Sequence, residues 1–137
     1  MRKLDQRGVA ALEFCLVSVA FFTFVFAIFD LGRYAITMQS LRNLANAGAR
    51  ANMINCYTNA AVSKTSPSGC TGDYLSTTQK QNAAPFLYRN GAAAPTISTT
   101  AGGAALTVTA SQAGFTMMMP IWGTALNGPS ASTKIPF

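Results

Sequence analysis

The chain has 137 residues, enough for one modest domain, and 10% of them are charged, against roughly 25% in a typical soluble domain. Half of the residues are hydrophobic, which fits a protein that lies partly in lipid or in a packed assembly. The basic residues give a net charge of +6 but are scattered, with no run and no interleaved aromatic side chains, so we expect no nucleic acid as a partner.

Residue sets for catalysis are missing from the sequence. The chain has no histidine and four acidic residues, and no two of these are spaced as a carboxylate pair. Neither paired carboxylates nor a Ser-His or Cys-His arrangement is therefore available. We expect a protein that is not an enzyme and that uses no cofactor and no metal ion.

A basic leader precedes an apolar run at the N-terminus. Arg2, Lys3 and Arg7 lie within the first eight residues. The run that follows, residues 9–29, would be ~32 Å long as a helix, which matches a hydrocarbon core of about 30 Å. We therefore predict a single transmembrane helix over residues 9–30, and the leader's charge favours a cytoplasmic N-terminus.

Glu13 is the residue of this run that is least favourable in a membrane. An acidic side chain at the centre of a bilayer costs roughly 2.5–3.5 kcal/mol on insertion scales, whereas the hydroxyls of Ser18 and Thr23 can bond to helix carbonyls. One interpretation is a signal anchor that stays in the membrane, with Glu13 close enough to the interface to be tolerated. The other is that a cation compensates the carboxylate.

The helical period continues beyond the apolar run. Apolar and small side chains recur on one face, at Tyr34, Met38, Leu41, Ala45 and Gly48. No proline occurs before Pro67, so we predict one helix from Val9 to Ile54, about 69 Å long, of which residues 31–54 lie outside the membrane. Asp30 and Arg33 are expected to pair on its surface.

Residues 55–137 are predicted to form a small head with loops and an antiparallel sheet, hence an α+β fold. We expect a short helix near residues 77–88 that Pro85 breaks, a hairpin of strands 96–100 and 105–110, a third strand at 115–119 and a short final strand at 133–136.

Two features of the head leave alternatives open. Cys56 and Cys70 can form a disulfide if the head faces an oxidising compartment, and a zinc site is the weaker alternative. The apolar residues Phe115, Met117, Met119, Ile121 and Trp122 are expected in the head core. The alternative is a surface for a partner subunit or for the outer leaflet of the membrane.

Several short motifs occur in order between residues 7 and 51. They are Arg7-Gly8-Val9-Ala10-Ala11-Leu12-Glu13-Phe14, Phe29-Asp30-Leu31-Gly32-Arg33-Tyr34, Gln39-Ser40-Leu41 with Asn43, and Ala45-Asn46-Ala47-Gly48-Ala49-Arg50. With these motifs, residues 7–51 resemble the TadE-like family, the minor pseudopilins of the tight-adherence (Flp) pilus system. Phe14 stands where Flp-type pilins commonly have tyrosine, so the aromatic ring is retained.

The resemblance implies a type IV pilin-like architecture and a role in assembling or priming an adhesive pilus. Residues 1–8 would be a leader that prepilin peptidase removes between Gly8 and Val9. Glu13 and Phe14 would then set the register of assembly, and Asp30, Gly32 and Arg33 would form a membrane-exit motif.

The implied partners are prepilin peptidase, other pilins or pseudopilins through the N-terminal helix, the pilus assembly platform and lipid of the bacterial inner membrane. The head would lie outside that membrane, and the protein could be incorporated into the pilus. Two alternatives remain: an unprocessed, membrane-anchored binding protein, and a major pilin that forms the fibre itself.

Overall fold

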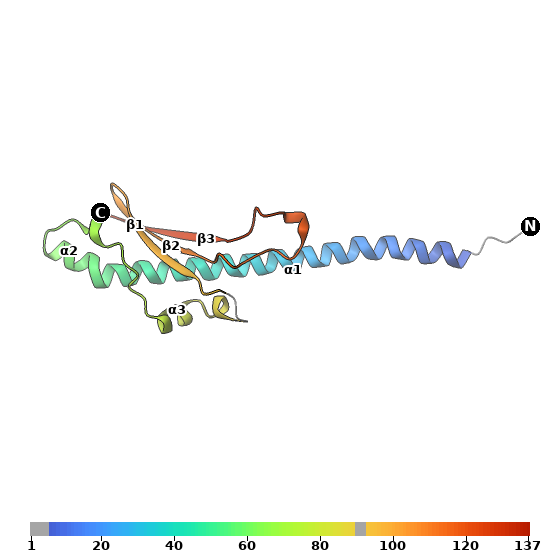
Figure 1. The fold of residues 1–137 in the computed structure, drawn as a ribbon, viewed down its shortest axis with the longest axis horizontal. Coiled ribbons are helices and arrows are strands. Elements are labelled where there is room, and N and C mark those ends of the chain that lie inside the picture. Colours follow the sequence, from blue (N-terminus) through green and yellow to red (C-terminus); the bar gives the residue numbers. More distant parts are fainter. Residues whose placement is uncertain (1–5, 90–92) are drawn as a thin grey trace, which may run out of the picture.

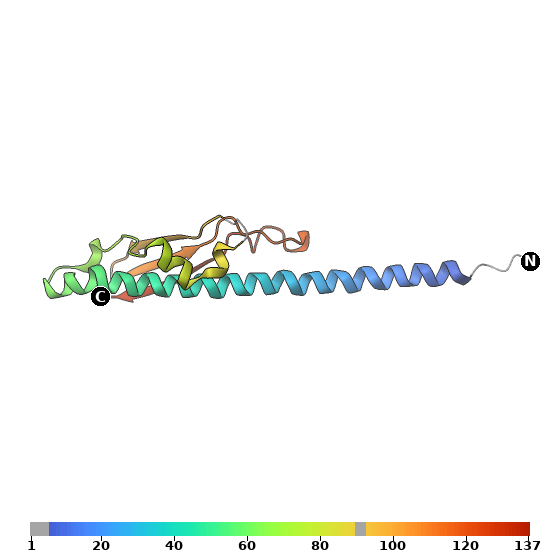
Figure 2. The ribbon, with the colours of Figure 1, turned by 90° about the horizontal axis from the view of Figure 1, so that it is seen from below.

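The computed structural model describes residues 6–89 and 93–137, so most of the predicted leader, residues 1–5, lies outside the described residues. One long helix dominates the molecule, and a small head packs along its C-terminal half (Figures 1 and 2). The helix consists of α1 (Gln6–Asn52), a π-helical turn η1 (Met53–Tyr57) and α2 (Thr58–Val62). The predicted α+β, pilin-like fold is confirmed.

The long helix ends later than predicted, at Val62 instead of Ile54. Side chains beyond residue 54 satisfy backbone carbonyls in the widened turn: Asn55 Nδ2 donates to the Ala51 carbonyl (2.8 Å) and Thr58 Oγ1 to the Met53 carbonyl (2.7 Å). Such bonds supply partners where the regular helical bonds are interrupted. The chain turns away only at Lys64, which has a positive φ of 56°.

The sheet has three antiparallel strands in the order β1-β2-β3. Strands β1 (Thr96–Ala101) and β2 (Ala105–Ser111) form the predicted hairpin, and β3 (Ser130–Pro136) pairs with β2 on its other side. The predicted strand at residues 115–119 is wrong. The third strand lies instead at β3, whose second half is the short final strand that the sequence predicted.

The core lies between α1 and one face of the sheet. Alternate side chains of β2 point at the helix, and they pack against its small and leucine residues; the buried members are Leu41, Leu44, Ala45, Ala49, Leu106, Val108 and Ala110. At Gly48 the helix and sheet approach so closely that an added Cβ would lie 3.1 Å from Val108 Cγ1. The opposite face of the sheet carries mainly serine and threonine.

Short elements close the head around α1. The predicted helix near residues 77–88 is present as α3 (Thr77–Ala83) and the 3-10 turn η3 (Pro85–Tyr88), divided before Pro85 as expected. Ser76 and Gln79 form a capping box at the start of α3. Two further 3-10 turns occur, η2 (Pro67–Gly69) and η4 (Pro120–Trp122).

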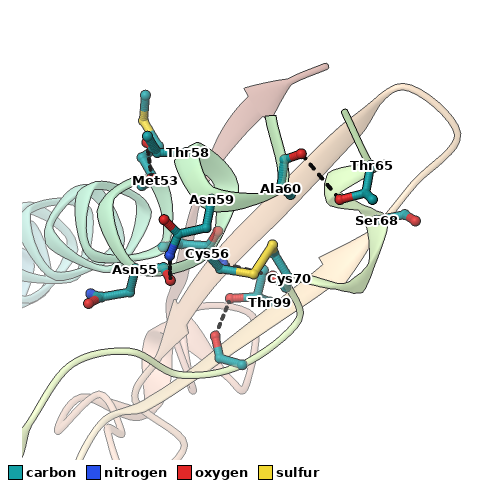
Figure 3. The surroundings of a disulfide bond; sticks show 12 residues. Met53, Asn55, Cys56, Thr58, Asn59, Ala60, Thr65, Ser68, Cys70 and Thr99 are labelled. Carbon is teal, nitrogen blue, oxygen red and sulfur yellow. Dashed lines mark hydrogen bonds between the residues drawn. A yellow bond between two sulfur atoms is a disulfide. The ribbon is translucent and has the colours of Figure 1, made fainter. Parts of the chain in front are cut away.

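A disulfide between Cys56 and Cys70 ties the far end of the helix to the loop that follows it (Figure 3). Cys56 is presented by the π-helical turn, and Asn52, one turn earlier, is fully buried and donates a 2.7 Å hydrogen bond to the Cys70 carbonyl. The disulfide alternative, and not the zinc alternative, is therefore the one that the structure contains.

Candidate functional site

A long connection between β2 and β3 is the part of the head that reaches furthest along α1 toward the N-terminus (Figures 1 and 2). We call residues 112–129 the strap. Its two sides are joined by hydrogen bonds, from Gln112 N to the Pro129 carbonyl and from Gly128 N to the Phe115 carbonyl, each 3.0 Å. Loops longer than about 12–15 residues are usually functional when they are ordered, which makes the strap a candidate functional element.

Asp30 of α1 holds the tip of the strap, by which we mean residues 118–122. Its carboxylate accepts hydrogen bonds from the backbone N–H groups of Met118 (3.0 and 3.2 Å) and Met119 (3.1 Å), and Arg33 Nη1 lies 3.3 Å from the same group. The side chain is only 2% exposed. Backbone donors and a guanidinium around one carboxylate stabilise its charged form, so Asp30 is an anchoring point for the strap.

The next turn of α1 adds an aromatic contact. The guanidinium of Arg33 lies 5.3 Å from the centre of the Phe115 ring, and the Tyr34 ring lies 6.2 Å from the same centre. Gly32 is exposed, and nothing lies within 4 Å of the position that its Cβ would occupy. Of the predicted membrane-exit residues, the structure therefore brings Asp30 and Arg33 to the strap, but not Gly32.

The expectation that the apolar residues of the strap form the head core is wrong. Phe115, Met117 and Met119 are half-buried, with the Phe115 ring beside Arg33 and Tyr34 of α1, while Ile121 is 58% exposed. Backbone donors that a strand would use are occupied elsewhere, because Asp30 takes those of Met118 and Met119, and Asn127 Oδ1 accepts from Met117 N. The segment is therefore held as a loop beside the helix.

The N-terminal part of α1 projects beyond the head. It is long and apolar enough to cross a membrane, and its most apolar stretch has no buried residue in the described part of the chain. The bonds predicted for its hydroxyls are confirmed, from Ser18 Oγ to the Cys15 carbonyl (2.9 Å) and from Thr23 Oγ1 to the Val19 carbonyl (2.7 Å).

The predicted processing and register residues all lie on this projecting part. Gly8 is exposed in the first turns of α1, Val9 follows it, and Glu13 with Phe14 is exposed one turn further on. Val9 and Glu13 are four residues apart in the helix, and are therefore neighbours on its surface. These residues form a group separate from the Asp30 anchor.

Sequence reasoning recognised Asp30 and Arg33 but missed the strap. Its backbone donors lie 88 and 89 positions beyond Asp30, and no local pattern links them to this carboxylate. The available signal was length, since the connection from Gln112 to Pro129 is longer than an ordinary hairpin loop.

The model of the family described as TadE-like protein matches residues 8–50. This match confirms the resemblance suspected from the sequence, and it covers the projecting part of α1, the Asp30 anchor and the helix face that carries the sheet. No curated protein and no solved structure matches the chain.

Proposed function

From the premise that residues 8–50 are TadE-like, we propose that this protein is a minor pseudopilin of a Tad-type pilus. In this proposal it is cleaved between Gly8 and Val9, remains in the inner membrane through residues 9–29 and takes part in assembling or priming the pilus. The family match supports the association with a pilus; the role of a minor subunit and the cleavage are our inference.

The observation that carries the proposal is the exposed N-terminal part of α1. An apolar helix with no buried residue in its most apolar stretch needs lipid or other chains around it, because exposed apolar surface of this size is unfavourable in water. Glu13 lies on that surface and is itself exposed. A carboxylate in such surroundings is stabilised by a cation as partner.

Cleavage after Gly8 would create this cation. The new α-amino group of Val9 would have a reference pKa of about 7.7–8.0 and would be largely protonated at neutral pH. It could meet Glu13 of its own helix, at i and i+4, or Glu13 of a neighbouring subunit. Pairing with a neighbour would neutralise both charges in lipid and fix the register between subunits, a role that is attested for buried polar groups in some proteins.

The position of Gly8 suits cleavage. A protease acts on extended backbone, so the first turns of α1 must unwind at the bond that is cut. Glycine lowers the cost of unwinding by about 1 kcal/mol relative to alanine, and nothing lies within 4 Å of the position that its Cβ would occupy. The site is therefore open to a protease.

Two observations support an external head. The bases Arg2, Lys3 and Arg7 favour a cytoplasmic N-terminus. The disulfide between Cys56 and Cys70 belongs in an oxidising compartment, which lies outside the bacterial cytoplasm.

The test is the N-terminus of the native protein, determined by mass spectrometry. We expect a chain that begins at Val9, and we expect Gly8→Ala to leave the leader attached, seen as an unshifted band on a gel. Gly32→Ala is the matched control, because it also replaces an exposed helical glycine of α1 and should be processed normally. Native protein that still begins at Met1 would support an unprocessed membrane anchor instead.

A further inference from the structure

We propose that the tip of the strap is a lipid-docking element, and that Met118 and Ile121 insert into the interfacial region of the outer leaflet beside the protein's own helix. The inference rests on the membrane anchoring in the proposed function, but not on cleavage or pilus assembly. It assigns to the strap a partner of defined chemistry, the surface of a phospholipid bilayer.

The height of the tip along α1 is the first argument. Phe29 is the last residue of the apolar run, and Asp30 immediately after it lies 3.0 Å from Met118 N. The strap tip therefore lies where the helix would leave the hydrocarbon. The helical part of the core begins at Leu41, about 16 Å further along the helix at 1.5 Å per residue, so the tip is the part of the head nearest to the membrane (Figure 1).

The composition of the strap is the second argument. Residues 112–129 include no charged side chain, so insertion of the tip would bury no charge of its own. Met118 is 77% exposed and Ile121 58% exposed. Trp122 follows Ile121 in the chain and is half-buried, with its indole Nε1 covered. Tryptophan rings are enriched at the headgroup level of bilayers.

Two backbone N–H groups of the tip already have acceptors within the protein and need no water. Unsatisfied N–H groups are costly near hydrocarbon, and Asp30 accepts the bonds of both Met118 N and Met119 N. Arg33 offsets the charge of this carboxylate. A loop whose Met118 and Met119 donors are satisfied, and whose Met118 and Ile121 side chains are exposed, is suited to the boundary between the headgroups and the acyl chains.

Continuity of the apolar surface favours lipid over a second protein chain as the occupant. Phe29 is 68% exposed and Phe26 57% exposed on the helix just before Asp30, the residue that holds the strap tip, so exposed apolar side chains of helix and strap lie at the same end of the head. The lipid that surrounds the helix would therefore meet the tip without any change in the position of the head.

Trp122 provides a direct test because it is the single tryptophan of the chain. The full-length protein is reconstituted at low density in phosphatidylcholine vesicles whose lipids are brominated either near the top of the acyl chains or near their ends. We expect the lipids brominated near the top to remove most of the Trp122 emission, those brominated near the ends to remove little, and aqueous iodide to quench less than in detergent.

Two variants complete the test. Met118→Asp combined with Ile121→Asp should restore the emission in brominated lipid and raise the quenching by iodide. Ile54→Asp is the matched control, because this residue is 72% exposed in η1, far along the long helix from the strap tip, and the change should leave the quenching unchanged. Disulfide formation in each variant verifies that the head has folded.

Two outcomes would overturn the inference. Trp122 that is insensitive to brominated lipid and quenched by iodide as strongly as in detergent would show that the tip stays in water. Protection from iodide that appears only at high protein density would show that a second copy, and not lipid, covers it. Neither result depends on the N-terminus, so a failure of this inference is distinguishable from a failure of cleavage after Gly8.

Discussion

Asp30 joins two parts of the chain that are far apart in sequence. From the sequence, the visible partner of this residue is Arg33, three positions away, and an exposed pair of this kind is worth a few tenths of a kcal/mol. The structure adds two backbone donors of the strap and buries the carboxylate. Asp30 and its pairing with Arg33 were predictable from the sequence. The bonds from Asp30 to the strap were not, because they depend on where a distant loop lies.

Replacing Asp30 should loosen the strap. In Asp30→Ala, the N–H groups of Met118 and Met119 lose their acceptor, which costs about 1–3 kcal/mol in the local stability of the tip. Amide hydrogen exchange in residues 115–122 should accelerate roughly ten- to hundredfold, at about 1.4 kcal/mol per factor of ten. Exchange followed by mass spectrometry measures this effect.

A matched control exists for the loss of an acidic side chain. Asp73 pairs with Lys80 on the surface of the head, away from the strap, so Asp73→Ala should leave exchange in residues 115–122 unchanged. Asp30→Asn keeps one acceptor oxygen and should give an intermediate rate. Equal exchange in the wild type and in Asp30→Ala would show that the strap is held by other contacts.

At the scale of elements, periodicity and turn residues were sufficient for the long helix and for the β1-β2 hairpin. They failed at the third strand, because residues 115–119 have strand-like composition while their backbone donors bond to Asp30 and Asn127. They also predicted the end of the helix at Ile54, before its observed end at Val62. The bonds from Asn55 and Thr58 back to the helix carbonyls are not apparent from composition. A tertiary partner, Asp30, decided the first difference, whereas local side-chain bonds within the helix accompany the second.

The contact between α1 and the sheet depends on the absence of a side chain at Gly48. Gly48→Leu should destabilise the head by about 1–3 kcal/mol, because the new side chain must displace the fully buried Val108. Thermal unfolding in detergent micelles measures the change. Gly32→Ala is the control, since open space surrounds that position and the helix should gain up to about 1 kcal/mol. An unchanged melting temperature in Gly48→Leu would contradict the close approach.

The disulfide should stabilise the end of the long helix. Opening a loop of this size costs about 3 kcal/mol in the chain-entropy model, so Cys56→Ser with Cys70→Ser should lower the unfolding temperature, and a reductant should have the same effect on the wild type. Cys15 is free and exposed on the apolar part of α1. Cys15→Ala should therefore respond to the reductant as the wild type does; an equal melting temperature with and without reductant would refute the prediction.

At the scale of the whole molecule, the chain divides into a head that buries its own core and a projecting helix that buries nothing of its most apolar stretch. The hydrophobic core of the head packs against α1 from Leu41 onward. The strap extends the contact between head and helix back to Asp30. The surface before Asp30 has no partner within the described chain, so its contacts must come from lipid or from other subunits.

Glu13→Gln tests which contacts that projecting helix makes. The amide keeps the size of the side chain and removes its charge, so insertion into the membrane should be unchanged or slightly easier. Attraction to the α-amino group of Val9 would be lost, and with it the register between subunits. We expect Glu13→Gln to fractionate with the membrane like the wild type, to be cleaved after Gly8, and to support few or no pili in sheared preparations.

Phe14→Tyr is the matched control, since it changes the adjacent residue without altering charge and should assemble normally. Normal piliation by Glu13→Gln would mean that the carboxylate plays no part in assembly, and the exposed helix would then be a membrane anchor alone.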